Sequence, residues 1–513
     1  MKLLARRIAQ GTIVLVLLAL GVGGYLFHAR KEWALADYQK QLRAKGERLS
    51  LAELTPQQVR PEQNSVRTFR DAYSNFWLKR PHREDVLETN PPVAMRMVAG
   101  GKALVGAMQS DLREDGTNTW REAEEALGEK EDSLELLEQL IEQPTLDFRL
   151  DYGQGFNLLL PHLSQLKQCC NYLKYAAVCD LHRGDAVAAT KRIRTMLAIV
   201  AGTADERLVI SQLVRFANMH IALTANWELL QSPAVTEEQL AVLQKDWGEL
   251  EFLRAGENAL LVERAMTEQT AEKIKSSSAQ FRSVVAGMGI AGSSSSGNWL
   301  DKVGQFGADK TKETLWRYAW AAPDQLRGLQ GTEAILEGVR MVQQGEAFKP
   351  ALDYQVARLK ELGIEAKSKV DENFLLINGQ DPRYLFTQSV LAVQRFSVRL
   401  MYEEAGRNLV ITAIALKRYQ LRHGSYPSEL GNLVPDFLAA VPRDPVDGRP
   451  LRFKLRDSAG FLLYSIGEDG IDNGGDPTPP STTKEFPWLR GRDQVWPTPA
   501  SAEEISSFRK RKR

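Results

Sequence analysis

The sequence predicts a mainly α-helical protein with an N-terminal transmembrane helix, a helical bundle or solenoid, and a small α+β domain at the C-terminus. Three observations predict this fold: a charge-free apolar run near the N-terminus, helical periodicity through the middle, and turn residues between short apolar runs after residue 400. With 513 residues the chain is too long for one compact core, so we expect about two to four units.

The apolar run, Ile8 to Phe27, contains no charged side chain. Twenty helical residues span about 30 Å, the thickness of the hydrocarbon core of a bilayer. Residues 1–31 are therefore predicted to be a cytoplasmic tail and transmembrane anchor. Because the N-terminal tail is short and basic, we expect it to stay in the cytoplasm. The protein would be a single-pass protein of the inner membrane, with its bulk in the periplasm.

A cleaved signal peptide is the alternative interpretation, because Ala34-Leu35-Ala36 has the form of a cleavage site. Charged residues separate it from the apolar run, however, and that run is longer than the roughly 7–15 residues typical of signal peptides. We therefore favour an uncleaved anchor. No other stretch reaches the length of a membrane span, so the remaining chain is expected to be water-soluble.

The overall composition excludes a large nucleic-acid footprint. Lys and Arg together number 66 and Asp and Glu 65, which gives a net charge of +1. A nucleic-acid-binding domain would need a clear basic excess. The one local excess, in residues 509–513, lies in a basic tail of residues 498–513. We expect the charge run 509–513 to be solvated; contact with anionic lipid or another polyanion is the alternative.

Residues 32–400 are predicted to be helical. Helices are expected at Trp33 to Lys45 and at Trp120 to Gln143. A further helix should end near Arg183-Gly184, with Asp185 as the N-cap of the next one. This pair resembles a tetratricopeptide-like hairpin, but no fixed period repeats three times, so a generic helical bundle is equally compatible. Two more helices should follow, and paired helices of this kind build surfaces for protein partners.

Residues 275–298 (KSSSAQFRSVVAGMGIAGSSSSGN) interrupt the helical pattern. Ser, Gly and small apolar residues dominate this segment, and it shows no stable periodicity. We expect a flexible insertion. Its apolar centre, Val284 to Ala291, is also compatible with contact to a membrane or a partner.

The three cysteines, Cys169, Cys170 and Cys179, show neither a disulfide framework nor zinc-ligand spacing. We expect them to be small buried side chains. The six histidines form no metal-binding motif, and no phosphate-binding or nucleophile motif is present. Acidic pairs such as Glu403-Glu404 are interpreted as solvated helix faces.

Residues 401–497 are predicted to form a separate small domain. A helix over Asn408 to Arg422 should stop at His423-Gly424, because Pro427 prevents its continuation. Two strand-like runs, Leu451 to Leu455 and Phe461 to Ile466, are joined by a short polar turn. The prediction is one helix packed on an antiparallel hairpin.

Several motifs occur in order along this domain. They are Tyr419…Gly424-Ser425-Tyr426-Pro427, Asp444-Pro445…Gly448-Arg449-Pro450-Leu451-Arg452-Phe453, Ser465-Ile466-Gly467-Glu468-Asp469-Gly470, Gly474-Gly475 and Asp493-Gln494-Val495-Trp496. Their order resembles the globular domain of the type II secretion major pseudopilin, the general secretion pathway protein G family. The match covers roughly residues 403–497. The resemblance implies an association with secretion or pilus-like machinery.

In that family the last loop binds calcium, which makes Asp469 and Asp493 the best ligand candidates by resemblance. Independently, Asp469, Asp472, Asn473 and Asp476 crowd one glycine-rich loop, and hard oxygen ligands suit Ca²⁺. The alternative is an Asp/Asn/Gly turn whose side chains bond only to their own backbone. The long proline-rich stretch 477–492 is also able to move Asp493 away from the loop.

The N-terminal segment departs from the pseudopilin pattern, because it lacks the Glu that follows the processing site. We therefore do not expect polymerisation as a pilus subunit. The predicted function is non-enzymatic: a membrane-anchored interaction or scaffold protein that binds partners through its helical region and C-terminal domain. An extracytoplasmic enzyme with an unrecognised site in the helical region and a purely structural envelope protein are the alternatives.

Overall fold

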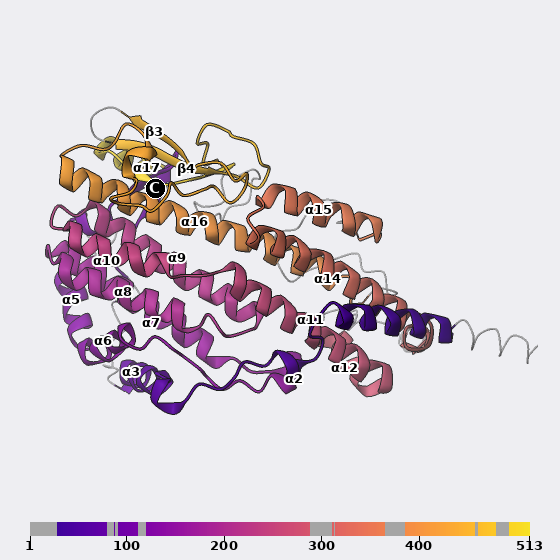
Figure 1. Cartoon of the computed structure of the whole chain (residues 1–513). Coiled ribbons are helices and arrows are strands. Elements are labelled where there is room, and N and C mark those ends of the chain that lie inside the picture. The colour runs from indigo at the N-terminus through magenta and orange to yellow at the C-terminus, as the bar shows by residue number, and fades with distance from the viewer. Residues whose placement is uncertain are drawn as a thin grey trace, which may run out of the picture.

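The computed structural model describes residues 28–78, 87, 91–110, 119–287, 310–311, 313–364, 385–456, 460–478 and 492–512. The fold is mainly helical with a small antiparallel sheet near the C-terminus, as predicted (Figure 1). The predicted anchor, residues 8–27, lies outside the described residues. Within the described ranges, no helix combines the length and apolarity needed to cross a membrane.

The N-terminal part wraps around one side of the molecule. Residues 28–44 are helical. The elements that follow are α2 (Leu51–Leu54), η1 (Pro61–Gln63), α3 (Val66–Leu78), β1 (Arg96–Ala99), β2 (Lys102–Leu104) and η2 (Gly106–Met108). Strands β1 and β2 pair antiparallel in a sheet that the sequence did not predict. The carboxylate of Glu228 holds this sheet by accepting the backbone N–H groups of Met95 and Gly106, each at 2.7 Å.

The helix expected over Trp120 to Gln143 is divided into α5 (Trp120–Gly128), α6 (Glu131–Glu138) and η3 (Gln139–Ile141). Thr119 begins α5 with a capping box to Glu122. The break falls just after Gly128, at Lys130, whose φ of −112° and ψ of 5° are not helical. Because Gly is a poor helix former, the chain turns there at low cost. After η4 (Tyr152–Asn157) the chain enters the central bundle.

The central bundle contains α7 (Pro161–His182), α8 (Ala186–Gly202), α9 (Val209–Gln231) and α10 (Glu237–Gly248). The predicted hairpin between α7 and α8 is confirmed: Gly184 has a φ of +83°, and Asp185 accepts the N–H of Ala188 at 2.9 Å. Helices α7, α8 and α9 all pack against one another. The three cysteines are buried thiols on α7, as expected.

The next group of helices is α11 (Leu253–Ser276), α12 (Ser278–Gly287), η5 (Trp316–Trp320), α14 (Ala321–Gln343) and α15 (Phe348–Glu361). The start of the segment expected to be a flexible insertion is therefore helical. The reason is tertiary: Phe281 of α12 is buried against Trp316 and the end of α11. The remainder of that segment, residues 288–298, lies outside the described residues.

Helix α16 (Ser389–His423) is the longest described helix and joins the bundle to the C-terminal sheet (Figure 1). It packs against α9, α10, α11 and α14 on one side and against β4 on the other. The predicted boundary between residues 400 and 401 therefore falls inside one continuous helix. Gly424, with a φ of +79°, ends α16 at the predicted position.

The predicted hairpin is confirmed as β3 (Arg452–Arg456) and β4 (Gly460–Ile466), which pair antiparallel. A third strand, β5 (Asp493–Val495), pairs antiparallel with β4. The element η6 (Leu430–Leu433) precedes the hairpin. Asp444 is fully buried. Its carboxylate accepts hydrogen bonds from Ser465 Oγ at 2.7 Å and from the N–H of Ile466 at 2.8 Å, so it holds the turn before β3 against strand β4.

The described residues that follow Trp496 fold against the N-terminal sheet, although most of the side chains of residues 501–510 remain exposed. Strand β6 (Thr498–Pro499) pairs parallel with β2, and α17 (Ala502–Lys512) packs on β1. Lys102 Nζ lies 2.6 Å from Glu504 Oε1, and Arg509 donates to Gln109 Oε1 at 2.8 Å. These partners are about 400 residues away in the sequence, so local composition did not reveal them.

Candidate functional site

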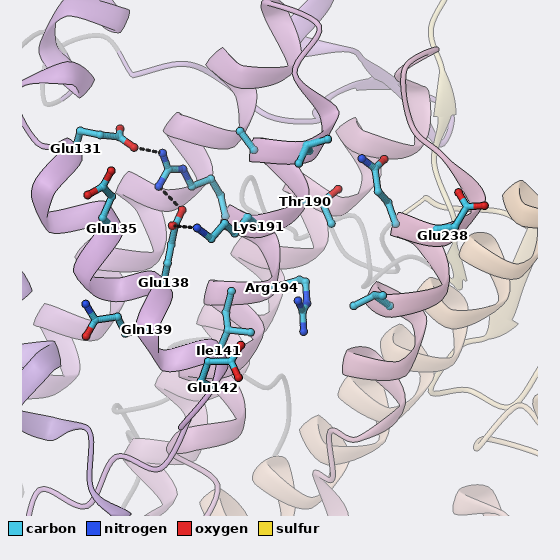
Figure 2. A pocket seen from close by; sticks show the side chains of 15 residues that line it. Glu131, Glu135, Glu138, Gln139, Ile141, Glu142, Thr190, Lys191, Arg194 and Glu238 are labelled. Atoms are coloured by element: carbon cyan, nitrogen blue, oxygen red, sulfur yellow. Dashed lines mark hydrogen bonds and ion pairs between the residues drawn. The ribbon is translucent and has the colours of Figure 1, made fainter.

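A groove with a volume of about 940 Å³ lies between α6 with η3, α8 and α10. Figure 2 shows the α6 glutamates on its left wall and Glu238 on its right wall. The lining side chains are Glu131, Glu135, Glu138, Gln139, Ile141, Glu142, Val187, Ala188, Thr190, Lys191, Arg192, Arg194, Glu238, Gln239 and Val242.

Helical periodicity builds the acidic wall. Leu134 and Leu137 of α6 are fully buried, so they turn the glutamates at the intervening positions toward the groove. Glu135 and Glu142 are seven residues apart, which places them on the same side of the helical segment. The sequence pattern showed this alternation, but it did not show which helix would face the glutamates.

The floor of the groove is a compact ion-pair cluster around Arg192, a buried residue. Its guanidinium bonds to Glu131 and lies 2.5 Å from Glu138 Oε1. Lys191 Nζ lies 2.5 Å from Glu138 Oε2 (Figure 2). Asp180, 3.7 Å from Arg192 Nε, completes the cluster. Arg183 lies 2.5 Å from Asp180, so three cations face three carboxylates. These groups neutralise one another and stiffen the contact between α6, α8 and α7.

Burial raises the pKa of Asp180 to about 6, although Arg192 and Arg183 oppose the shift. Burial alone would lower the pKa of Arg192, but Glu131 and Glu138 outweigh it and the pKa is raised. The guanidinium therefore stays charged. The cluster is suited to holding three helices in place, because its charges are already paired.

Other groups on the rim are unpaired. Glu135, Glu142 and Glu238 are exposed and form no ion pair within the described residues. Val187 is 70% exposed and Val242 is 40% exposed, so the rim also presents apolar surface. The groove therefore combines a neutralised floor with a rim that carries both apolar side chains and uncompensated negative charge.

The groove continues into a smaller hollow of about 70 Å³. Arg194 and Ile141 line both spaces, and Arg194 Nε lies 2.7 Å from Asp246 Oδ2. Glu249 lines the far side of this hollow. The acidic character thus extends along α10.

The predicted calcium residues lie around one turn after β4, and their carboxylates accept N–H groups of that turn; Asp472 also accepts the hydroxyl proton of Tyr464 at 2.9 Å and lies 3.5 Å from Arg452 Nε. Asp469, Asp472 and Asp476 each accept the N–H of the residue two positions further on, at 2.9 Å. Asn473 donates its side-chain amide to Ile471 O at 3.0 Å. These bonds have the geometry of the alternative interpretation, an Asp/Asn/Gly turn.

Asp493 lies beside this turn, so the stretch 477–492 does not carry it away. Its carboxylate accepts the N–H groups of Asn473, Gly475 and Asp476, at 3.3, 2.7 and 3.1 Å. Burial raises the pKa of Asp493 despite these bonds. Among the described residues, no three His, Cys, Asp or Glu side chains lie close enough to hold a metal ion. Binding Ca²⁺ here would require the turn to exchange N–H bonds for metal ligation.

A second polar cluster lies between α9 and α16, and it corrects the interpretation of Glu403-Glu404 as a solvated face. Glu403 is fully buried; its carboxylate lies 2.7 Å from His220 Nε2 and 2.5 Å from Arg399 Nε. Burial alone would raise the pKa of Glu403, but His220 and Arg399 outweigh it and the pKa is lowered. Glu404 is also buried and pairs with Arg407 at 2.9 Å.

Sequence reasoning did not single out the groove residues, because their arrangement depends on three helices meeting in space. The glutamates spaced along residues 131–142 were the signal in the sequence that could have indicated the groove. Comparisons of the chain with protein-family models, with curated proteins and with solved structures found no match.

Proposed function

We propose that this protein is a membrane-anchored, extracytoplasmic docking protein, and that the groove between α6, α8 and α10 binds a basic segment of a partner protein. The observation that supports this proposal is the rim, where Glu135, Glu142 and Glu238 have no ion-pair partner in the described part of the chain. Exposed Val187 and Val242 line the same groove. An amphipathic segment with Lys or Arg on one face and apolar side chains on the other complements such a surface.

The ion pairs on the floor of the groove support the binding of a ligand at the rim. Since Arg192 and Lys191 are already held by Glu131 and Glu138, a ligand meets a neutral base and a negative rim. Opposite charges on the rim speed association and select the partner, while the apolar contacts supply most of the affinity.

Titration of the full chain with a fluorescent amphipathic Lys/Arg-rich peptide tests the proposal. The double variant Glu135→Gln/Glu142→Gln removes two rim charges. It should weaken binding by about 1 kcal/mol, roughly fivefold, since exposed charge pairs contribute about 0.2–1 kcal/mol each. The matched control Glu346→Gln/Asp436→Asn neutralises two exposed carboxylates outside the groove. Equal affinity for all three proteins would contradict the proposal.

The C-terminal module is proposed as a second docking unit, associated with type II secretion or pilus-like machinery. This part of the proposal depends on the resemblance described above. Helix α16 packs against both the bundle and β4, which supports a C-terminal domain that is held in place instead of flexibly linked. Co-purification of the tagged full chain with a secretion component tests it, and failure with every pseudopilin would count against it.

Calcium binding by Asp469, Asp472, Asn473, Asp476 and Asp493 is a further proposal. Melting of the full chain with Ca²⁺ and with a chelator tests it. If the ion binds the folded loop, Ca²⁺ should raise the melting temperature. The variant Asp493→Asn should lose that response. An unchanged melting temperature in Ca²⁺ would eliminate the proposal.

A second candidate function, an extracytoplasmic enzyme, would find its strongest candidate group in the pair of His220 and Glu403. The carboxylate is buried while the His220 side chain stays 22% exposed, so the carboxylate is placed to orient a histidine that solvent reaches. Screening the wild type against His220→Gln for hydrolysis of generic ester and peptide substrates tests this candidate. An activity lost in the variant would favour it over docking.

A further inference from the structure

Two segments far apart in the sequence meet at the end of the molecule where the described chain begins. Lys31 Nζ donates to Ala319 O at 3.0 Å, and Lys275 Nζ lies 3.3 Å from Glu32 Oε2. The helix of residues 28–44 also packs on α14, since Leu35 and Leu42 share a cluster with Leu329. Figure 1 shows this end on the right, with the indigo helix beside α14 and α12.

Large apolar side chains are exposed at this end. Trp33 is 68% exposed, Tyr318 is 62% exposed and Leu315 is 42% exposed. Their neighbours behave differently: Trp316 is fully buried and donates its Nε1 proton to Asp324 at 3.1 Å. Leu315 and Tyr318 are therefore exposed on the outer side of a segment whose inner side contributes Trp316 to the core.

Cationic side chains are close to these residues in the sequence. Arg30 and Lys310 are exposed, and the Arg317 guanidinium lies 5.6 Å from the ring of Tyr318. Arg317 is held in place by Lys275 O and Ser278 Oγ, at 3.0 and 2.7 Å. Trp, Tyr, Lys and Arg together form the composition of the polar interface of a bilayer, where rings and flexible cations sit among the lipid headgroups.

The position of the predicted anchor identifies the occupant. The described residues begin at His28, directly after the apolar stretch 8–27. Trp33 comes six residues after that stretch, about 9 Å along a helix. The headgroup region on each side of a bilayer is about 6 Å thick. The backbone of Trp33 would therefore lie near the outer edge of the headgroup region. Because helical side chains tilt toward the N-terminus, here toward the bilayer, the Trp33 ring and the surface tied to it by the Lys31 contact would meet the headgroups.

We propose that Trp33, Leu315 and Tyr318 form a lipid-interface patch that seats the body directly on the membrane. This inference depends on the proposed membrane anchor. With the patch seated, the long axis of the molecule is fixed relative to the bilayer, and the C-terminal sheet lies at the end far from it (Figure 1). The anchor and the patch together would then hold the body in one orientation relative to the membrane.

Spin labels on the full chain test this inference in vesicles of phosphatidylcholine with a minority of phosphatidylglycerol. Nitroxides are attached at Trp33→Cys, Tyr318→Cys and, as an exposed control on the bundle, Val187→Cys. The native thiols of Cys169, Cys170 and Cys179 are buried, and unsubstituted protein measures their residual labelling. The ratio of collision rates with oxygen and with a water-soluble nickel chelate reports the depth of each label.

Position 318 is decisive, because it is remote in sequence from the anchor. The collision ratio at 318 should be several-fold higher than at 187 and should fall when vesicles are replaced by detergent. A label at 33 in lipid with one at 318 in water would overturn the patch and leave the anchor intact. Failure of the protein to float with vesicles would instead reject the anchor. Protection at 318 that persists in detergent would show a protein cover, and it would also overturn the patch. Leu315→Cys is the second site if Tyr318→Cys does not fold.

Discussion

The carboxylate of Glu403 lies 2.7 Å from Nε2 of His220 and 2.5 Å from Nε of Arg399, in the contact between α9 and α16. This contact joins the central bundle to the helix that carries the C-terminal sheet. Removing one member of a buried ion pair leaves the other charge without a partner in a poorly solvated place. The cluster therefore contributes to holding the two parts of the molecule together.

We expect Glu403→Ala to lower the free energy of unfolding by about 3–5 kcal/mol, because Arg399 loses its buried partner. Denaturant unfolding measures the loss. The control is Glu125→Ala, which breaks the pair of Arg121 and Glu125, whose side chains are both mostly exposed. The control should show little change. Equal effects of the two substitutions would mean that the α9–α16 contact does not depend on Glu403.

A second expectation concerns pH. Burial raises the pKa of Glu228 from 4.5 to about 7, although the N–H groups of Met95, Gly106 and Ala107 oppose the shift. The folded protein therefore binds this proton more tightly than the unfolded chain. The stability from this residue is fully present below about pH 4.5 and falls by about 3 kcal/mol as pH rises to about 7.

Denaturant unfolding of the wild type and of Glu228→Gln across this pH range measures the contribution. The difference in stability between the two proteins should change across pH 4.5–7, because the variant does not titrate at this position. Asp180, whose pKa is raised to about 6, titrates in both proteins and cancels in the comparison. Parallel curves would show that Glu228 is not the source.

Gly202, at the end of α8, is expected to tolerate no side chain. A Cβ there would lie 1.7 Å from Pro144 O, and the chain cannot give way because Leu146 N donates to Gly202 O at 3.1 Å. Gly202→Ala should cost about 1–3 kcal/mol of stability by overpacking. Gly248, at the end of α10, has nothing within 4 Å and is the control. Gly248→Ala should be neutral or slightly stabilising. Similar melting temperatures for both variants would contradict the tight contact beneath the groove.

Deleting residues 502–513 tests the position of α17. Since Glu504 pairs with Lys102 and α17 packs on β1, the truncated protein should melt at a lower temperature and lose protease protection near β1. The control is Lys510→Ala/Lys512→Ala, which removes two charges and keeps the helix. Loss of charge alone should not lower the melting temperature or the protease protection. A solvated tail would leave both proteins as stable as the wild type.

The sequence predicted those parts of the fold that local signals determine. Gly184 and Asp185 mark the turn between α7 and α8, which is confirmed. The two apolar runs of the predicted hairpin are confirmed as the paired strands β3 and β4. The helical start of residues 275–298 was missed because Phe281 finds its partner, Trp316, 35 residues away. Contacts between residues that lie far apart in the sequence leave no local pattern.

The candidate site was less predictable for the same reason. A glutamate on a helix has the same local pattern whether it is solvated, like Glu135, or fully buried, like Glu403. Only the facing helix distinguishes them: among the described residues no cation pairs with Glu135, whereas His220 lies 2.7 Å from Glu403. The calcium prediction identified residues that do gather around Asp493, but residue type alone did not show that their oxygens accept backbone N–H groups.

Photo-crosslinking from the groove rim tests the docking proposal most directly. A benzophenone side chain at Val187 in the full chain, irradiated in the native membrane, should form an adduct with a Lys/Arg-rich segment that mass spectrometry locates. The same adduct should weaken in Glu135→Gln/Glu142→Gln and at high salt. It should be absent from position 356 on α15, where Val356 is 50% exposed. No adduct at 187, or an adduct with a segment that carries no basic residues, would contradict the account.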